Sequence, residues 1–487
     1  MKLNQTVLGF IISKILKKTR QNDEDQKARV EKENGKKRGG QALSRRFAFL
    51  ACALFVVQGF VAILGATSLV VPDLPSPVPY EYGRSVHLGL ATCWPLIGAM
   101  GMVYFFTVDE LKADLYSLKI VRWQFWIVVL STAGLLGTLT FRIGNGREFL
   151  DGLPMFYAGI SLAILLCAYN LIQTLKKSKQ HITPASAIMT GGMVFLGLLL
   201  IPNVLNYTNP IVDEAVKYWV VHLWEEMAFE LITSGFIASF FIASGLVEKK
   251  DMEKWLYLEA SLAVSGGLFG TGHHYYWIGY PAIWLIIGVV FSLIQMIPVI
   301  LLAHLTYKGL KRHRPLKRVE KLTLWMILSS LLYHLTGASM LGMLMTIPWV
   351  NLYTHGTYIT SGHAHLALFG VMGFLVLAGS HAILSRGTVL SRKSYIWAVA
   401  GVLFLNLGVI TMSSSLLVAG FLQSYLWRYL GMDFTQVQGL ISPYLLARVA
   451  GGSFYTVGSI LFGWRIVNVW WLTREDGKIS EEVSKRI

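Results

Sequence analysis

The stretch Phe47–Val71, FAFLACALFVVQGFVAILGATSLVV, runs for 25 residues without a charged side chain. A helix needs about 20 consecutive apolar residues to cross the hydrocarbon core of a bilayer. The run is continuous rather than alternating, and only helices and closed barrels satisfy their backbone hydrogen bonds inside lipid. This stretch therefore predicts a transmembrane α-helix.

Similar runs recur along the whole chain. Of its 487 residues, 54% are hydrophobic and 14% are charged, whereas a soluble protein carries about 25% charged residues. We expect a basic N-terminal tail over 1–46, a membrane domain over 47–472 and a C-terminal tail over 473–487. The fold predicted is an all-α integral membrane bundle of about twelve transmembrane helices, at approximately 47–71, 86–107, 124–142, 154–175, 186–203, 216–246, 254–274, 279–306, 321–346, 361–384, 394–420 and 441–472.

The net charge of +16 is distributed as membrane topology requires, rather than as a nucleic-acid-binding surface requires. The first 46 residues hold 13 Lys and Arg against 5 Asp and Glu, and the connection 308–321 carries a further basic cluster. Basic connections alternate with connections poor in Lys and Arg, such as 72–85 and 347–360. We therefore expect a multi-pass protein of the lipid bilayer with both termini in the cytoplasm and no nucleic-acid partner.

One apolar span carries a histidine and two carboxylates at intervals of four residues. The segment 220–230 reads Val-Val-His222-Leu-Trp-Glu-Glu226-Met-Ala-Phe-Glu230, and residues four apart share one face of a helix. A solvated acidic face does not suit these surroundings, because buried carboxylates are costly unless they are paired or bind a metal. His222 and Glu226 are therefore candidate metal ligands, with Glu230 on the same face.

Two further clusters contain adjacent or nearly adjacent histidines. In Gly270-Thr-Gly-His273-His274-Tyr the two histidines point about 100° apart on a helix, so both reach one metal only near a helix end. In His363-Ala-His365 the side chains point to nearly opposite sides of a helix, so they can bind two different cofactors that flank it. Imidazole suits iron, copper or zinc. Three more histidines stand alone in apolar spans, as buried hydrogen-bonded residues or as functional ones: His304, His334 and His381.

The order of these blocks resembles the core subunit of the haem–copper oxidase superfamily, which has twelve helices. In that family one helix gives a low-spin haem ligand, a later one the first ligand of a second metal, the next a His-His pair and a further one a His-x-His. All four blocks occur here in order, from His87 to His365. Oxidases usually follow the first metal ligand with Pro-Glu-Val-Tyr, whereas this chain has Leu-Trp-Glu-Glu226. His-Leu-Trp-x-Glu together with Gly-Thr-Gly-His-His-Tyr resembles the large catalytic subunit of nitric oxide reductase.

This resemblance implies a role for each residue of the blocks. His87 and His365 would be the axial ligands of a low-spin haem b, and His363 the proximal ligand of a high-spin haem b. A non-haem iron opposite the high-spin haem would have four ligands: His222, Glu226, His273 and His274.

Three further positions extend the comparison. Glu230 matches a second family glutamate near the site. Glu148, after Arg147, matches a glutamate that binds a calcium ion between the haem propionates, although an ordinary loop ion pair explains Arg147 and Glu148 equally well. The family usually has a glutamate 21 residues after the His-His pair, where this chain has Gln295. Glutamine cannot carry a proton as a carboxylate does, so either Glu226 and Glu230 suffice or the proton route differs.

The activity that the resemblance implies is the reduction of two NO, with two electrons and two protons, to nitrous oxide and water. Glu226 and Glu230 would tune the iron and pass protons. Three alternatives stay open. One is a divergent oxygen reductase with copper at the second site. Another is NO dismutation to nitrogen and oxygen, which Gln295 permits, and the third is a non-catalytic haem carrier.

Electron entry requires a partner on this interpretation. Cys52, Cys93 and Cys167 all fall in apolar spans and none forms the C-x-x-C-H motif of a covalently attached haem. We therefore expect a separate small redox subunit, cytochrome c-like or cupredoxin-like. The candidate histidines lie mostly at the outer ends of their helices. The metal sites are accordingly expected toward the outer side of a bacterial cytoplasmic membrane, where an extracytoplasmic donor can reach them.

Overall fold

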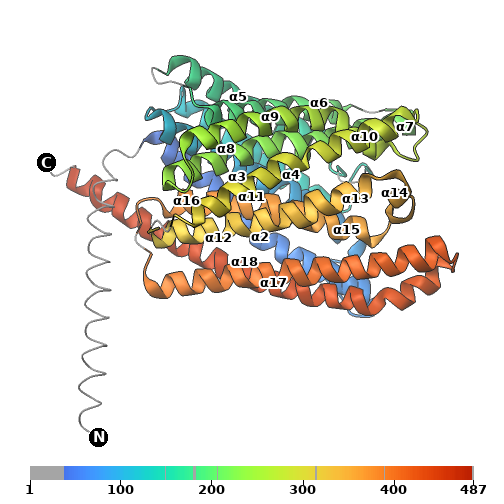
Figure 1. Cartoon of the computed structure of the whole chain (residues 1–487). Helices are drawn as coiled ribbons and strands as arrows, with labels where there is room; N and C mark the ends of the chain where they lie inside the picture. The colour runs from blue at the N-terminus through green and yellow to red at the C-terminus, as the bar shows by residue number, and fades with distance from the viewer. Residues whose placement is uncertain are drawn as a thin grey trace, which may run out of the picture.

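The computed structural model describes residues 38–147, 150–178, 182–205, 207–312, 315–388 and 390–484, with the side chains of 469 and 471–484 not described. All the regular secondary structure of the described residues is helical, and these residues contain no strand. Figure 1 shows the helices running side by side along one long axis. The predicted basic tail lies outside the described residues up to residue 37, as does Glu148.

The helical elements follow the predicted spans closely. Their bounds are α2 Gly39–Val70, α3 Tyr80–Leu111, α4 Leu118–Thr140, α5 Pro154–Lys177, α6 Pro184–Val204, α7 Pro210–Leu223, η1 Trp224–Phe229, α8 Glu230–Ser244, α9 Lys249–Gly270, η2 Thr271–Tyr275, α10 Ile283–Ile294, α11 Met296–Leu310, α12 Arg318–Tyr333, η3 His334–Leu341, α13 Gly342–Thr346, α14 Pro348–Thr354, α15 Tyr358–Ala364, η4 His365–Gly373, α16 Phe374–Ser385, α17 Arg392–Gln423, η5 Ser424–Tyr429 and α18 Phe434–Ser484.

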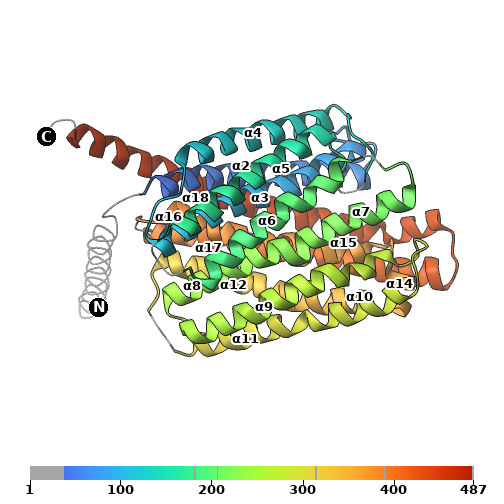
Figure 2. The same cartoon turned by 90° about the horizontal axis from the view of Figure 1, so that it is seen from above.

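Eleven helical segments among the described residues are long and apolar enough to cross a membrane. The expected span at 254–274 is the one that differs. It folds as α9, whose first six residues include five charged ones and whose middle carries Glu259. These charges lower its hydropathy below that of a lipid-facing span, although α9 lies within the bundle beside α8 and α10 (Figures 1 and 2). The predicted all-helical membrane fold is confirmed.

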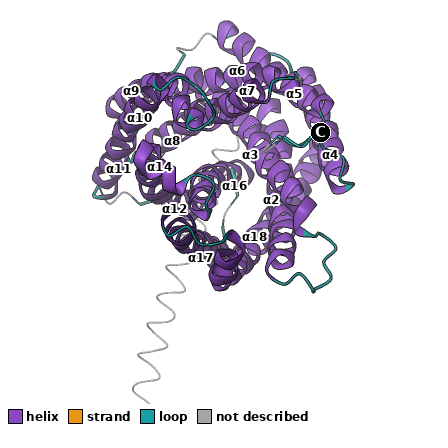
Figure 3. Ribbon diagram, turned by 90° about the vertical axis from the view of Figure 1, so that its right-hand side faces the viewer, coloured by secondary structure: helices purple, strands orange, loops and turns teal. Residues whose placement is uncertain are grey.

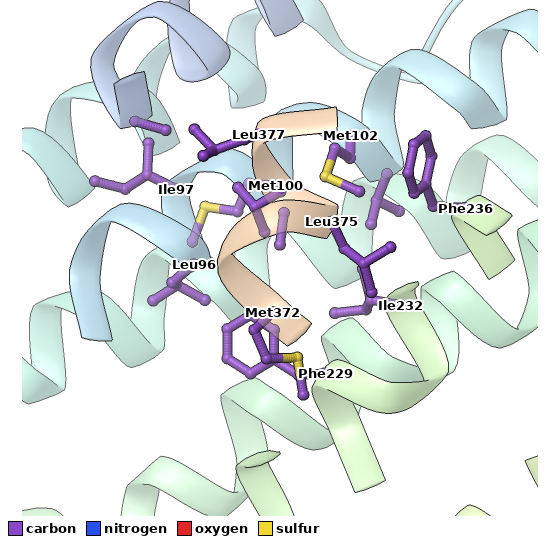
Figure 4. Close-up of a cluster of buried hydrophobic side chains, with 14 of the residues drawn as sticks. Leu96, Ile97, Met100, Met102, Phe229, Ile232, Phe236, Met372, Leu375 and Leu377 are labelled. Atoms are coloured by element: carbon purple, nitrogen blue, oxygen red, sulfur yellow. The ribbon is translucent and has the colours of Figure 1, made fainter. Parts of the chain in front are cut away.

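Three segments are more enclosed than the others. In the 18-residue apolar stretch of each segment, 83% of the residues are buried in α3, 78% in α7–α8 and 78% in α15–α16. In α4 the share is 28%. Viewed along the helix axes, α3, α8 and α16 lie toward the middle of the bundle (Figure 3). Their apolar side chains interlock in the core, where Met100 of α3, Ile232 of α8 and Leu375 of α16 gather (Figure 4). The predicted functional histidines therefore arise largely from the inner helices.

Close helix contacts depend on glycine. A Cβ added at Gly408 of α17 would lie 2.5 Å from the backbone nitrogen of Tyr455 in α18, and one added at Gly451 would lie 2.5 Å from that of Met412. Small residues let membrane helices approach closely, which provides van der Waals contact where lipid offers no hydrophobic driving force. This packing holds α17 and α18 against each other, and α17 also contacts α15.

Four of the helical segments contain π-helical turns: η1, η3, η4 and η5. A π-helical turn inserts an extra residue and rotates the side chains that follow it, and such turns are frequent at functional sites. Two of them start within two residues of predicted ligands, since η1 follows His222 and η4 begins at His365. α7 and α15 lie toward the end of the bundle opposite the projecting end of α18 (Figures 1 and 2).

Candidate metal centre

His222 and Glu226 meet where α7 changes into the π-helical η1. His222 is 1% exposed, and its Nδ1 lies 3.3 Å from Oε1 of Glu226. The π-helical turn keeps these residues on the same side of the segment, facing the connection between α9 and α10. The predicted pairing of a histidine and a carboxylate on one helix face is therefore present in the structure.

His273 and His274 approach the same point from the end of α9. The chain tightens there into the 3₁₀ segment η2 and leaves the helix at Tyr276. The two imidazole rings have centres 4.3 Å apart and planes inclined at 48°. Their centres lie 4.9 Å and 5.1 Å from that of His222. The helix end thus removes the divergence that adjacent histidines have in a regular α-helix.

One ligand atom from each of four residues lies within 4.8 Å of the others: His222, Glu226, His273 and His274. Three imidazole nitrogens and one carboxylate oxygen form a donor set that suits iron, and a carboxylate among histidines is typical of non-haem Fe(II) sites. Both ring nitrogens of His222 are buried without a hydrogen bond of good geometry. A buried imidazole left in this condition is costly unless it binds a metal, so the four residues fit the metal that the sequence predicted.

Ser292 of α10 holds one of these ligands in place. Its hydroxyl donates to the carbonyl of Gly288 at 2.7 Å, so it accepts the Nδ1 proton of His273 at 2.9 Å. This fixes the tautomer that leaves Nε2 of His273 free for a metal, as outer partners of metal-bound histidines generally do. Sequence reasoning missed Ser292 because it lies on the next helix.

Two more residues shape the centre without supplying a ligand. The ring of Tyr218 stacks on that of His274, with centres 5.2 Å apart and planes inclined at 13°. Gly270 lies beside His222, where an added Cβ would be 3.5 Å from its Nε2. The sequence signal for Gly270 was its place in the Gly-Thr-Gly-His-His motif, whereas nothing in the sequence pointed to Tyr218.

His87 of α3 and His365 of η4 face each other with ring centres 6.4 Å apart and planes inclined at 22°. A metal–nitrogen bond to imidazole is about 2.0–2.1 Å long, and the nitrogen lies about 1.1 Å from the centre of its ring. Two imidazoles that bind one metal from opposite sides therefore have ring centres about 6 Å apart. Nδ1 of His365 donates to the carbonyl of Ser361 at 2.7 Å. Nδ1 of His87 is buried without a partner. The pair therefore fits axial ligation of one haem.

His363 belongs to the other side of the same segment. Its Nδ1 donates to the carbonyl of Gly337 at 3.0 Å, which leaves Nε2 free. Its ring also lies beside Gly342, where an added Cβ would be 2.9 Å from Cε1, so His363 packs against η3 and the start of α13. The divergence of His363 and His365 corresponds to the two-cofactor arrangement that the sequence predicted.

A cavity opens between α3, η1 and η4, beside these histidines. Its lining is mostly apolar and includes Leu88, Trp94, Val221, Trp224, Phe369 and Met372. The ring of Phe369 lies 5.7 Å from that of His87 and 5.6 Å from that of His365. A mostly apolar space whose lining includes Phe369, the neighbour of both His87 and His365, suits a haem macrocycle.

The remaining predicted residues are not members of the four-residue centre. Glu230 begins α8, with its Oε1 4.0 Å from Nε2 of His334. Gln295 ends α10 and packs against α9, where a Cβ added at Gly266 would lie 2.4 Å from its Nε2. Arg147 bonds to Asp213 and to the carbonyl of Leu205. Glu148 lies outside the described residues, so calcium binding there stays a prediction.

Known proteins resemble this chain in both sequence and fold. Residues 42–454 match the family described as cytochrome C and quinol oxidase polypeptide I. The chain is 28% identical to a nitric oxide reductase subunit of Stutzerimonas stutzeri, over 87% of this chain and 93% of that protein. It is 22% identical to the bacteroid cytochrome c oxidase subunit 1 homolog of Bradyrhizobium diazoefficiens, over 90% of this chain and 83% of that protein. A haem-copper terminal oxidase dimer solved by cryo-electron microscopy has a similar fold, with a TM-score of 0.71 at 16% identity, over 89% of this chain and 84% of that one.

Proposed function

Because the chain belongs to the family of cytochrome c and quinol oxidase polypeptide I, we propose that it is the catalytic subunit of a nitric oxide reductase. It would reduce two NO to nitrous oxide and water. The observation that carries this proposal is Glu226, whose carboxylate lies among His222, His273 and His274. An oxygen ligand among imidazoles favours iron over copper at the second metal site. Similarity to the nitric oxide reductase subunit of Stutzerimonas stutzeri over most of both chains supports the same assignment.

The cofactors proposed are two b-type haems and one non-haem iron. His87 and His365 would hold the low-spin haem, His363 the high-spin haem, and the four-residue centre the iron. When bound, these groups supply the electrons and the positive charge that reduction of NO requires.

The residues of the chain contribute position and protection. His363 and the four-residue centre would hold two binding positions close together, which would provide the proximity that N–N bond formation needs. Apolar side chains such as Val221 and Met372 line the neighbouring cavity and would keep bulk water away from the haem that it would hold. Glu226 adds a negative charge that tunes the iron. Glu230, the next carboxyl group on the same face as Glu226, would pass protons that the reaction consumes.

Placement in the membrane completes the proposal. The basic connections would face the cytoplasm, as would both termini, and the metal centre would lie toward the outer side. A small extracytoplasmic subunit, cytochrome c-like or cupredoxin-like, would deliver the electrons.

A second function, oxygen reduction, has support of its own. The relatives at 22% identity include cytochrome c oxidase subunit 1 homologs. Metal analysis of the purified protein separates the two functions. The reductase requires one iron beyond the haem iron, and no copper. Stoichiometric copper, with no iron beyond that of the haems, would favour the oxidase instead.

A further inference from the structure

Lys217 of α7 is a buried cationic residue that is not a member of the four-residue centre. It is 3% exposed and lies five residues before His222 on the same helix. An ionisable side chain inside a membrane span is costly unless a partner satisfies it, and such residues usually have a function. The contacts of its ammonium group therefore indicate what Lys217 does.

The ammonium group of Lys217 contacts two residues of its own helix. Its Nζ lies 2.5 Å from Oε2 of Glu214 and 4.7 Å from the ring centre of Tyr218. The face of an aromatic ring attracts a cation. Because the side chain of Glu214 is 44% exposed, water screens its negative charge, whereas the charge of Lys217 is buried. The buried end of this ion pair is therefore positive and rests on the ring of Tyr218.

Tyr218 connects this cation to the four-residue centre. Its ring stacks on the imidazole of His274, with centres 5.2 Å apart and planes inclined at 13°. The ring of His274 cannot tilt without losing this contact, so Tyr218 positions His274 by stacking, as Ser292 positions His273 by a hydrogen bond. The two distances to Tyr218 place Nζ of Lys217 no more than about 10 Å from the ring centre of His274.

A fixed positive charge beside a redox metal favours the reduced form of that metal. Reduction lowers the charge of the metal by one, so the repulsion between the metal and the ammonium group becomes weaker. Over about 10 Å, at an effective dielectric constant of about 20, a single charge changes the ratio of reduced to oxidised metal by about tenfold. The screened carboxylate of Glu214 offsets part of this effect. We therefore expect Lys217 to change the ratio by about fivefold, which is about 40 mV for a one-electron couple.

We propose that Lys217 and Tyr218, called the lysine–tyrosine stack, position His274 and raise the reduction potential of the metal in the four-residue centre. This role rests on the proposed function for the identity of that metal as iron. An electron from the external donor reduces Fe(III) to Fe(II), and the stack makes this electron transfer more favourable. Lys217 and Tyr218 gain and lose no electron or proton in the process, so they act through His274 and through the electric field of the ammonium group.

The test compares variants of the purified complex that differ at this stack. Lys217→Met keeps an unbranched side chain and removes the charge, Tyr218→Phe keeps the aromatic ring, and Tyr218→Leu removes it. Lys177→Met is the matched control, because Nζ of Lys177, at the end of α5, lies 4.3 Å from the ring centre of Tyr116. Iron affinity is measured by chelator competition. The midpoint potential of the non-haem iron is measured by a redox titration followed with Mössbauer spectroscopy.

The expected result separates the charge from the ring. Lys217→Met lowers the midpoint potential by about 40 mV, the equivalent of a fivefold change in the ratio of reduced to oxidised iron, and its iron content stays that of wild type. Tyr218→Leu lowers the iron affinity by about tenfold, the lower end of what loss of an outer partner costs, and broadens the Mössbauer lines because His274 can tilt. Tyr218→Phe and Lys177→Met keep the wild-type affinity and potential.

An unchanged potential in Lys217→Met would overturn the role of the charge, and an unchanged iron affinity in Tyr218→Leu would overturn the role of the ring. If Lys217→Met does not assemble, Glu214→Gln gives a second measurement at an exposed position. Loss of the carboxylate leaves the charge of Lys217 uncompensated and raises the potential, whereas an unchanged or lower potential contradicts the proposal. Copper at the wild-type centre, with the same shifts in the copper potential, would refute the reductase and leave the lysine–tyrosine stack in place.

Discussion

Nδ1 of His222 lies 3.3 Å from Oε1 of Glu226, across the turn in which α7 becomes the π-helical η1. The two residues come from one continuous segment, so their relative position is set by local backbone geometry and not by a contact between distant helices. The other two members of the centre, His273 and His274, come from a separate helix end. Glu226 is therefore the residue through which the centre is most directly tested.

Substitution of Glu226 by alanine removes the one oxygen donor of the four-residue centre. We expect iron binding to weaken by more than about 100-fold, because loss of even an outer partner of a metal ligand costs about 10–100-fold. Haem content should stay unchanged, since His87, His363 and His365 are untouched. Non-haem iron per haem in the purified variant measures the effect, with Glu248→Gln, an exposed carboxylate paired with Arg312, as the control. Iron retained at wild-type stoichiometry would show that Glu226 is not a ligand.

Substitution of Ser292 by alanine removes the acceptor that holds His273 at Nδ1. We expect the iron affinity to fall by about 10–100-fold, as it does when the outer partner of a metal-bound histidine is lost. Chelator competition measures that affinity. Ser415→Ala is the matched control, because the hydroxyl of Ser415 bonds only within its own helix, to Thr411 and Met412. Equal iron retention in the two variants would assign Ser292 no part in the centre.

Substitution of His87 by glycine removes one of the two rings that face each other at 6.4 Å. The low-spin haem spectrum should disappear, and added imidazole should restore it by entering the space that the side chain leaves. His304→Ala, which changes a histidine of α11 outside these clusters, should leave the absorbance spectrum unchanged. A low-spin spectrum that persists in the His87 variant would show that another residue is the ligand.

Substitution of Gly408 by alanine tests the packing of α17 on α18. The added Cβ would lie 2.5 Å from the backbone nitrogen of Tyr455, so one helix must shift. Overpacking of this kind costs about 1–3 kcal/mol, and the thermal unfolding midpoint in detergent should fall. Gly452→Ala, which meets no atom within 4 Å, is the control. An unchanged unfolding midpoint in the Gly408 variant would mean that the two helices accommodate the added methyl group without loss of stability.

The parts of the fold and of the site that depend on local periodicity could be predicted from the sequence. Apolar runs such as Phe47–Val71 predict helices because a bilayer demands their length, and the spacing of four between His222 and Glu226 predicts a shared face. The span at 254–274 differs because α9 carries Glu259 and a charged first turn. Its burial depends on a partner in α8, which no periodicity in α9 reveals.

Tertiary placement accounts for what sequence reasoning could not supply. The convergence of His273 and His274 depends on a 3₁₀ segment at the end of α9, a change of helix type that the motif alone does not specify. Ser292 reaches His273 from a different helix, 19 residues along the chain.

The central claim is that this chain reduces NO. The measurement that tests it most directly is anaerobic turnover of the purified protein with an artificial reductant and NO, with gas analysis of the product, followed by oxygen uptake by the same preparation. We expect one nitrous oxide for every two NO consumed, and loss of that activity in Glu226→Ala. No consumption of NO together with brisk oxygen uptake would contradict it and would place the chain among the oxygen reductases.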